Sequence, residues 1–88
     1  MNVLIFGYGL HGDGFDSAMY FLSHEDNVIV TDIRTREMLG ESIDYLESKG
    51  AVIHCGGHMT EDFLWADVVI KTPSIRLTNE FLAYSRIT

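Results

Sequence analysis

The chain has 88 residues, of which 47% are hydrophobic, and its formal net charge at pH 7 is −7. That length predicts one small domain. The acidic balance argues against binding to nucleic acid or to anionic membranes, because both need clustered lysine and arginine. A single cysteine, Cys55, excludes an intramolecular disulfide. With no signal peptide and no apolar run long enough to span a bilayer, we expect a cytoplasmic protein.

The first expected element is a buried strand over Asn2–Phe6, followed at once by a glycine-rich turn over Gly7–Gly14. Glycine permits a sharp bend and lets the backbone approach an anion closely. A helix follows, with apolar residues at positions 15, 18, 19 and 22 on one face. Its N-terminus offers unpaired N–H groups, so this layout predicts a site for a phosphate or diphosphate. The alternative is a turn between strand and helix that binds no ligand.

The glycine turn can be aligned in two registers. Gly7, Gly9 and Gly12 match the G-x-G-x-x-G pattern of dinucleotide-binding folds. If Gly12 were the third glycine, acidic residues such as Asp13 would fall on the face of the helix that should pack against the sheet. If Gly14 takes that role, the apolar residues face the sheet instead. We therefore predict that Gly14 packs the helix against the strand and that the turn is two residues longer than usual.

The rest of the chain alternates between strand and helix patterns. Strands are expected over 28–31, 51–54 and 68–71, and helices over 39–46, from Thr60 and from Thr78. Gly40 should delay or disrupt the start of the helix over 39–46, and the two threonines are expected to cap their helices. This alternation predicts an α/β fold, a Rossmann-like parallel sheet of about four strands with helices on both faces.

Ligands of such sheets bind at the carboxyl ends of the strands, where three segments should meet. These are the glycine turn, Asp32-Ile33-Arg34 and Thr72-Pro73-Ser74. An acid in the place of Asp32 accepts a hydrogen bond from a ribose hydroxyl in dinucleotide folds; the alternative is an acid that caps the next loop. Arg34 is suited to pair with a phosphate or to stack on a base. The third segment offers hydroxyl groups and a proline that fixes the turn.

No metal site and no catalytic residue is expected. His54, Cys55 and His58 have the spacing of zinc ligands, but a structural zinc site needs four ligands and the sequence has no second cluster. No residues resemble a nucleophile with its base or a pair of catalytic acids.

Taken together, these segments resemble the N-terminal domain of the Mur ligases, over the whole chain and in order. The resemblance rests on the glycine turn, the strand-end Asp32-x-Arg34, Gly57-His58, the apolar strand that runs into Thr72-Pro73-Ser74-Ile75, and Asn79-Glu80-Phe81. The most similar branch of the family adds D-glutamate to UDP-N-acetylmuramoyl-L-alanine during peptidoglycan synthesis, in the biogenesis of the cell wall.

The resemblance implies a domain that binds the UDP part of UDP-N-acetylmuramoyl-L-alanine. It further implies that ATP and Mg²⁺ bind in other domains of a full-length ligase, and that this domain holds no cofactor. By resemblance, Leu10 and His11 would lie against the diphosphate, Asp32 would contact the uracil and not a ribose, and Arg34 would lie near the uracil or the phosphates. Thr72 and Ser74 would face the nucleotide from the opposite strand end. The full set of residues implied to bind UDP is Gly9, Leu10, His11, Gly12, Gly14, Asp32, Ile33, Arg34, Thr72, Pro73 and Ser74. Because the sequence lacks the G-x-x-x-x-G-K-[ST] motif of an ATP-binding loop, we expect these 88 residues alone to be inactive.

The sequence departs from the family pattern at two places. Thr72-Pro73-Ser74-Ile75 stands where the family usually has Ser-Pro-Gly-Ile, so a side chain replaces a glycine. Asp13 adds a carboxylate to the glycine turn, which is unfavourable beside a diphosphate unless the carboxylate points away.

Two other functions fit the same pattern. One is an NAD(P)- or adenine-dinucleotide-binding domain of an oxidoreductase or regulatory sensor, and the other is a scaffold without a ligand. The resemblance places the next strand of the family's sheet near Thr88, so we expect an N-terminal domain on its own. Such a domain would associate weakly with itself through the open sheet edge.

Overall fold

The computed structural model describes residues 1–9 and 12–73. Their four strands form one parallel sheet in the order β3-β2-β1-β4. The elements are β1 (Asn2–Phe6), α1 (Asp13–Ser23), β2 (Asn27–Asp32), α2 (Arg36–Leu39), α3 (Ser42–Ser48), β3 (Val52–Cys55), α4 (Thr60–Trp65) and β4 (Val68–Lys71). The predicted Rossmann-like α/β fold is confirmed. The helix expected after Thr78 lies outside the described residues, and within them no helix is long and apolar enough to cross a membrane.

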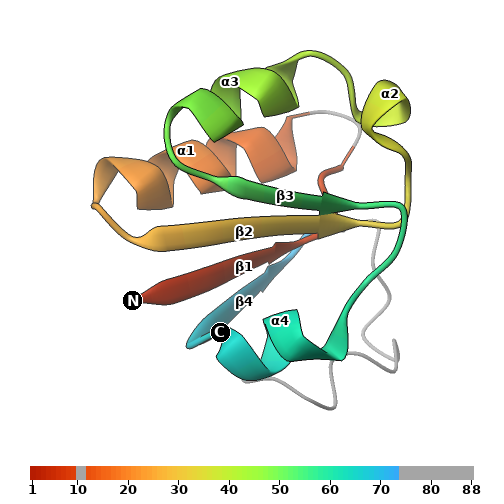
Figure 1. The fold of residues 1–88 in the computed structure, drawn as a ribbon. Helices are drawn as coiled ribbons and strands as arrows, with labels where there is room; N and C mark the ends of the chain where they lie inside the picture. Colours follow the sequence, from red (N-terminus) through yellow and green to blue (C-terminus); the bar gives the residue numbers. More distant parts are fainter. Residues whose placement is uncertain (10–11, 74–88) are drawn as a thin grey trace.

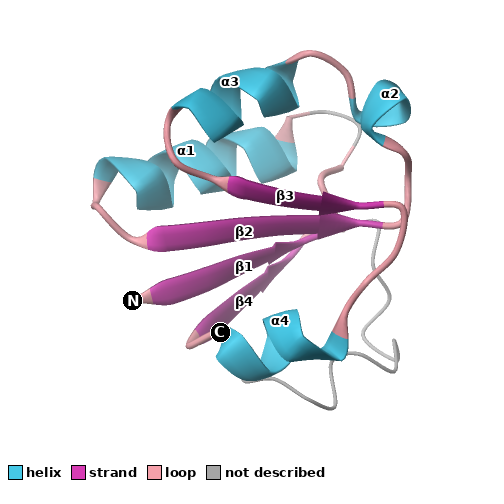
Figure 2. Ribbon diagram, in the orientation of Figure 1, coloured by secondary structure: helices cyan, strands magenta, loops and turns pink. Residues whose placement is uncertain are grey.

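Helices cover both faces of the sheet, with α1 and α3 on one face and α4 on the other (Figure 1). The central strand β1 supplies the core of both layers. Val3 and Ile5 point to the α1 and α3 side, Leu4 and Phe6 point to the α4 side, and all four are completely buried. Burial on both faces explains why this strand is a continuous apolar run in the sequence. The loops after β2 and β3 leave the sheet at the same edge (Figure 2).

A close contact at Gly14 sets the position of α1. The helix begins at Asp13, directly after Gly12, whose φ of 87° is in the left-handed region. The Gly14 N–H donates to the carbonyl of Tyr8 at 2.9 Å. A Cβ on Gly14 would lie 2.3 Å from that carbonyl oxygen, so no side chain fits. Gly14 is therefore the helix-packing glycine, as predicted, and Ala18 one turn later is completely buried.

The helix starts differ partly from the expectations. The break at Gly40 is confirmed, because its φ of 88° ends α2 and a separate helix begins at Ser42. The prediction that Thr60 caps its helix is wrong, since Thr60 is the first residue of α4 and no side-chain hydrogen bond caps that helix. Thr35 caps α2 through its side-chain oxygen, which no sequence pattern indicated. The break leaves α2 as a single turn at the carboxyl edge of the sheet.

Replacing Gly14 by alanine should destabilise the fold by about 1–3 kcal/mol, the usual cost of overpacking, because the Tyr8 carbonyl or the whole helix must move. Gly12→Asn is the matched control in the same turn. Among the described residues nothing lies within 4 Å of a Cβ at Gly12, and asparagine adopts a left-handed φ at a smaller cost than most residues, so a smaller loss is expected there. Urea unfolding of both variants measures the losses. Equal losses would contradict the packing role of Gly14.

Candidate functional site

A cavity of about 300 Å³ opens at the carboxyl edge of the sheet, on the side of α1 and α3. Four segments form it: the glycine turn, the start of α1, the loop and single turn after β2, and the start of α3. Its walls are formed by Tyr8, Gly9, Gly12, Phe15, Arg34, Met38, Leu39 and Ser42. Apolar and aromatic walls with a few polar groups are typical of small-molecule sites, and this volume is at the lower end of their range.

The carboxylate of Asp32, the last residue of β2, connects two of these segments. Its Oδ2 accepts the backbone N–H of Tyr8 at 2.8 Å and an Nη2–H of Arg34 at 2.7 Å. Its Oδ1 accepts the backbone N–H of Arg34 at 2.8 Å and the Nε–H at 3.0 Å. Asp32 is only 4% exposed, and these four donors occupy both of its oxygens.

The electrostatics of this pair follow from its contacts. Burial alone would raise the pKa of the Asp32 carboxyl, but the hydrogen bonds from Arg34 and Tyr8 outweigh burial and hold this pKa below its usual value. The hydrogen bond to Asp32 in turn raises the pKa of the Arg34 guanidinium. Both groups are therefore charged at neutral pH and form a bidentate ion pair, which is stronger and more directional than a single contact.

Arg34 extends from this pair to the wall of the cavity. Its Nη2 also lies 3.4 Å from the carbonyl oxygen of Gly9, so the guanidinium lies against the glycine turn. The arginine side chain is 20% exposed. Within residues 1–9 and 12–73, Asp32 and Gly9 account for the contacts of Nε and Nη2, and Nη1 has no partner. Nη1 is thus the part of this guanidinium that is available to a ligand.

The opposite side of the cavity is held by a second polar contact. The hydroxyl of Tyr8 hydrogen-bonds to Oγ of Ser42, the first residue of α3. Burial raises the pKa of Tyr8 more than this hydrogen bond lowers it, so the phenol stays protonated at neutral pH. Phe15 from α1 and Leu39 from α2 add apolar surface beside the pair.

The predicted site residues are not all in one place. Gly9, Gly12 and Arg34 line the cavity, and Asp32 lies behind Arg34. Ile33 is 68% exposed and is not part of the cavity wall. Gly14 is buried against the Tyr8 carbonyl and serves packing.

The segment after β4 follows the strand that pairs with β1 on the side away from β2. Thr72 is 3% exposed, and its N–H and hydroxyl both point to the carbonyl of Phe6, at 3.1 and 3.4 Å. Pro73 follows it and is exposed. Neither residue lines the cavity. The predicted contacts at Leu10, His11 and Ser74 lie outside the described residues.

Five wall residues were not among the predicted site residues: Tyr8, Phe15, Met38, Leu39 and Ser42. Phe15 and Leu39 have the spacing of core residues, so the sequence pattern does not reveal that they also line the cavity. The break at Gly40 was the available signal, because a single helical turn before it must remain at the strand ends. No sequence signal marks Ser42.

Asp13 lies beside the glycine turn, as its position in the sequence suggested. The residue is exposed, and a methyl group built on Gly9 would be 3.7 Å from its Oδ2. Acidic residues in the first turn stabilise a helix, because they interact favourably with the positive end of its dipole. The same carboxylate places a negative charge next to the cavity.

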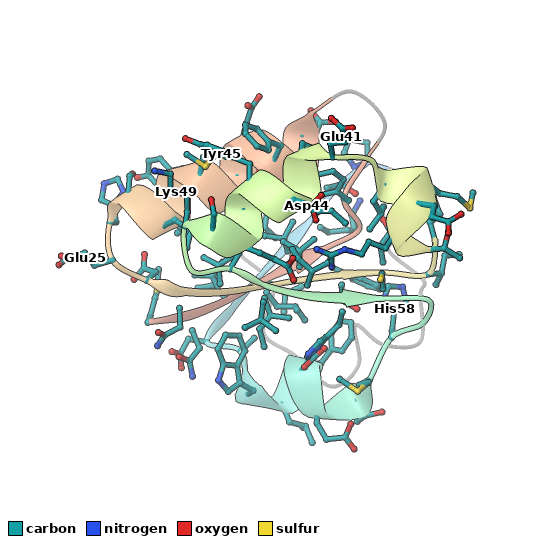
Figure 3. All side chains as sticks on the ribbon, turned by 45° about the horizontal axis from the view of Figure 1, so that its top comes forward. Glu25, Glu41, Asp44, Tyr45, Lys49 and His58 are labelled. Carbon is teal, nitrogen blue, oxygen red and sulfur yellow. The ribbon has the colours of Figure 1, made fainter. Side chains whose placement is uncertain are left out.

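A separate set of polar contacts holds α4 and its loop on the other face of the sheet, where Figure 3 labels His58. His54 Nδ1 lies 2.7 Å from Asp62 Oδ2, and His58 Nδ1 lies 2.8 Å from Thr31 Oγ1. Burial lowers the pKa of His58, although the charges of Asp32 and Asp62 oppose this shift. Among the described residues, no three His, Cys, Asp or Glu side chains form a group that could hold a metal ion.

Asp32→Asn should reduce stability in a pH-dependent way. The pKa of Asp32 is lowered in the folded state, so its contribution is fully present above the unfolded pKa of about 3.9 and is lost as the pH falls through the folded pKa. The difference in free energy of unfolding between wild type and variant should therefore be large at pH 7 and shrink towards pH 3. Urea unfolding at both values measures it.

The exposed Asp16→Asn is the control for this comparison, with a small difference expected at either pH. A difference for Asp32→Asn that stays constant between pH 7 and pH 3 would contradict the ion pair.

Comparisons with known proteins add to this geometry. No family model matches the chain. It is 34% identical over 88 aligned positions to UDP-N-acetylmuramoylalanine–D-glutamate ligase of Borreliella afzelii, with 98% of this chain and 20% of that protein covered. It is 30% identical to the ligase of the same name from Roseiflexus sp., with 97% and 18% covered. An uncharacterized protein of Methanothermobacter thermautotrophicus is 38% identical over 80 positions, with 85% and 25% covered.

These matches confirm the predicted resemblance to the N-terminal part of the Mur ligases. The chain spans about a fifth of the length of the ligases that it matches.

Proposed function

We propose that this chain, which is similar over nearly its whole length to a fragment of the Mur ligases, recognises the nucleotide end of a UDP-N-acetylmuramoyl substrate in a peptidoglycan-synthesis ligase. The observation that carries the proposal is the cavity at the carboxyl edge, where the glycine turn, the start of α1 and Arg34 meet. Open α/β sheets bind their ligands at this edge. The names of the relatives supply the chemical class, a uridine diphosphate joined to a sugar.

In this proposal the uracil enters the cavity, where Tyr8, Phe15 and Leu39 provide surface for a flat ring. The diphosphate lies over the glycine turn, near Gly9, Gly12 and the N-terminus of α1, where backbone N–H groups favour anions. Leu10, His11, Thr72, Pro73 and Ser74 stay proposed contacts of the diphosphate and sugar. ATP and Mg²⁺ are proposed to bind in other parts of a full-length ligase, because the sequence has no ATP-binding loop motif.

The state of Asp32 argues against the ribose contact that a dinucleotide-binding domain would make. Dinucleotide folds use the acid after the second strand to accept a hydrogen bond from a ribose hydroxyl. Both oxygens of Asp32 already accept two donors each. A ribose would have to displace Arg34 or the backbone of the turn, which costs a charge-assisted hydrogen bond.

Titration of the protein with UDP should give saturable binding, whereas NAD and ADP should bind more weakly. Calorimetry measures the affinities, and NMR of backbone amides locates the site. The expected shifts are centred on the residues from Gly7 to Gly14 and from Asp32 to Arg34. A preference for NAD or ADP would move the chain to the dinucleotide class, and the absence of UDP binding would contradict the proposal.

Asp13→Asn should tighten UDP binding, because it removes a carboxylate next to the proposed diphosphate position. At a separation of about 6 Å in a water-like dielectric, one pair of charges costs about 0.7 kcal/mol, so we expect an increase of about threefold in affinity. Raising the salt concentration should shrink this gain. Uridine, which lacks phosphate, is the control ligand, and its affinity should not change. Weaker or unchanged binding of UDP would place the diphosphate elsewhere.

A further inference from the structure

A half-buried histidine, His58, lies in the loop between β3 and α4, on the α4 side of the sheet (Figure 3). Its Nδ1 is 2.8 Å from Oγ1 of Thr31, a completely buried residue of β2 that directly precedes Asp32. Its ring is nearly perpendicular to those of Phe6 and Phe63, with centroids 4.8 and 6.3 Å away. The imidazole thus packs against β1, β2 and α4 and holds the loop on the sheet.

The same loop also holds the main chain beside the nucleotide cavity. The Gly56 N–H donates to the carbonyl of Arg34 at 2.9 Å, and the Gly57 N–H donates to that of Asp32 at 3.3 Å. Arg34 lines the cavity at the carboxyl edge, and Asp32 is bonded to its guanidinium. Because His58 follows Gly57 directly, a movement of the imidazole also moves these two donors.

The backbone before His58 permits such a movement. Gly56 and Gly57 have φ angles of 81° and 153°, and among the described residues a Cβ at either position meets nothing within 4 Å. Glycine changes conformation without the steric limits of other residues, so the pair can act as a hinge. A shallow cavity of about 430 Å³, formed by the end of β3 and the loop up to Met59, gives water access to His58.

A proton on His58 is unfavourable in this arrangement. A charged imidazolium loses hydration beside apolar rings, and burial lowers the pKa of His58 more than the charges of Asp32 and Asp62 raise it. The other titratable groups of the shallow cavity are His54, whose Nδ1 lies 2.7 Å from Asp62 Oδ2, and Cys55. The protonated form of His58 is therefore more stable in water than against the sheet.

We propose that His58 is a pH-sensitive positioning residue: when it takes up a proton, the loop after β3 leaves the sheet, the carbonyls of Asp32 and Arg34 lose their two hydrogen bonds, and the affinity of the cavity for its nucleotide falls. The inference rests on the proposed function, because it takes a nucleotide as the ligand. It assigns a role in binding to a residue that does not line the nucleotide cavity. The effect should begin below the ordinary imidazole pKa of about 6.5.

Thermodynamic linkage makes the proposal specific in its sign. If protonation of His58 weakens nucleotide binding, then binding must disfavour protonation by the same factor. A bound diphosphate is an anion, and its charge alone would raise the pKa of a nearby histidine. The proposal predicts the opposite, a lower pKa of His58 in the complex, so the sign separates a coupled movement from direct electrostatics.

An NMR titration of the His58 imidazole in the wild type tests this sign and does not depend on the folding of any variant. UDP-glucose is the ligand, because the terminal phosphate of UDP itself titrates near pH 6, whereas both phosphates of UDP-glucose are esterified. Saturation with UDP-glucose should lower the pKa of His58 by about half a unit, equivalent to a threefold change in affinity. A pKa that rises or stays constant would overturn the proposal.

Calorimetry at pH 7.5 and pH 5 measures the consequence for affinity. The wild type should bind UDP-glucose about threefold more weakly at pH 5. In His58→Gln this loss should disappear, because the amide hydrogen-bonds to Thr31 but carries no charge. His24→Gln is the matched control, since His24 is exposed at the end of α1 and contacts the carbonyl of Tyr20, and it should keep the pH dependence of the wild type.

The comparison of variant with wild type also removes the contributions of His11 and His54, which are present in both. An equal loss at pH 5 in His58→Gln and in the wild type would overturn the proposal, while binding at pH 7.5 would still support the proposed function. Failure of the wild type to bind UDP-glucose at pH 7.5 would overturn both. Circular dichroism at each pH shows whether each variant is folded.

Discussion

The buried carboxylate of Asp32 accepts four hydrogen bonds at the end of β2, and the arrangement of the site depends on them. One donor comes from the turn after β1 and three come from Arg34. The loop after β3 joins the same point, since Gly56 N–H donates to the carbonyl of Arg34 and Gly57 N–H to that of Asp32. Three loops that follow three parallel strands are thus tied together at one edge. Removing a partner from such a pair leaves an uncompensated buried charge, which is far more costly than the net stability that the pair supplies.

This arrangement is possible because the sheet beneath it is rigid. β1 is buried on both faces and pairs with β2 and β4, so its carboxyl end has a fixed position. Gly14 then fixes the angle at which α1 leaves the turn, because the helix backbone touches the Tyr8 carbonyl. Packing holds the strands and the helix, and hydrogen bonds to Asp32 arrange the loops between them. The cavity lies between the packed helices and the loops that these hydrogen bonds arrange.

Most of the fold follows from local patterns in the sequence. The strands were predictable because burial on both faces leaves a continuous apolar run, as at Val3–Phe6. The helix after the glycine turn was predictable because burial of one helix face leaves a periodic apolar pattern, as at Ala18. The choice of Gly14 over Gly12 followed from the same periodicity. The capping of α4 was predicted wrongly. Threonine is a common residue at helix N-caps, but the path of the preceding loop decides which residue takes that position, and here Thr60 is already the first residue of the helix.

The site was less predictable than the fold. Asp32 and Arg34 were identified by their place after a strand, but their contact with each other depends on side-chain geometry that spacing does not encode. The wall formed by Tyr8 and Ser42 joins residues 34 positions apart, which only the packing of α3 beside the turn brings together. Long-range contacts between single polar residues leave no periodic signal in one sequence.

The central claim is that a uridine nucleotide occupies the cavity at the carboxyl edge of the sheet. A crystal structure of the chain with UDP tests it most directly. The account predicts that the uracil lies between Tyr8 and Leu39 and that the diphosphate lies over the glycine turn near Gly9 and Gly12. UDP bound at another surface of the protein would contradict it.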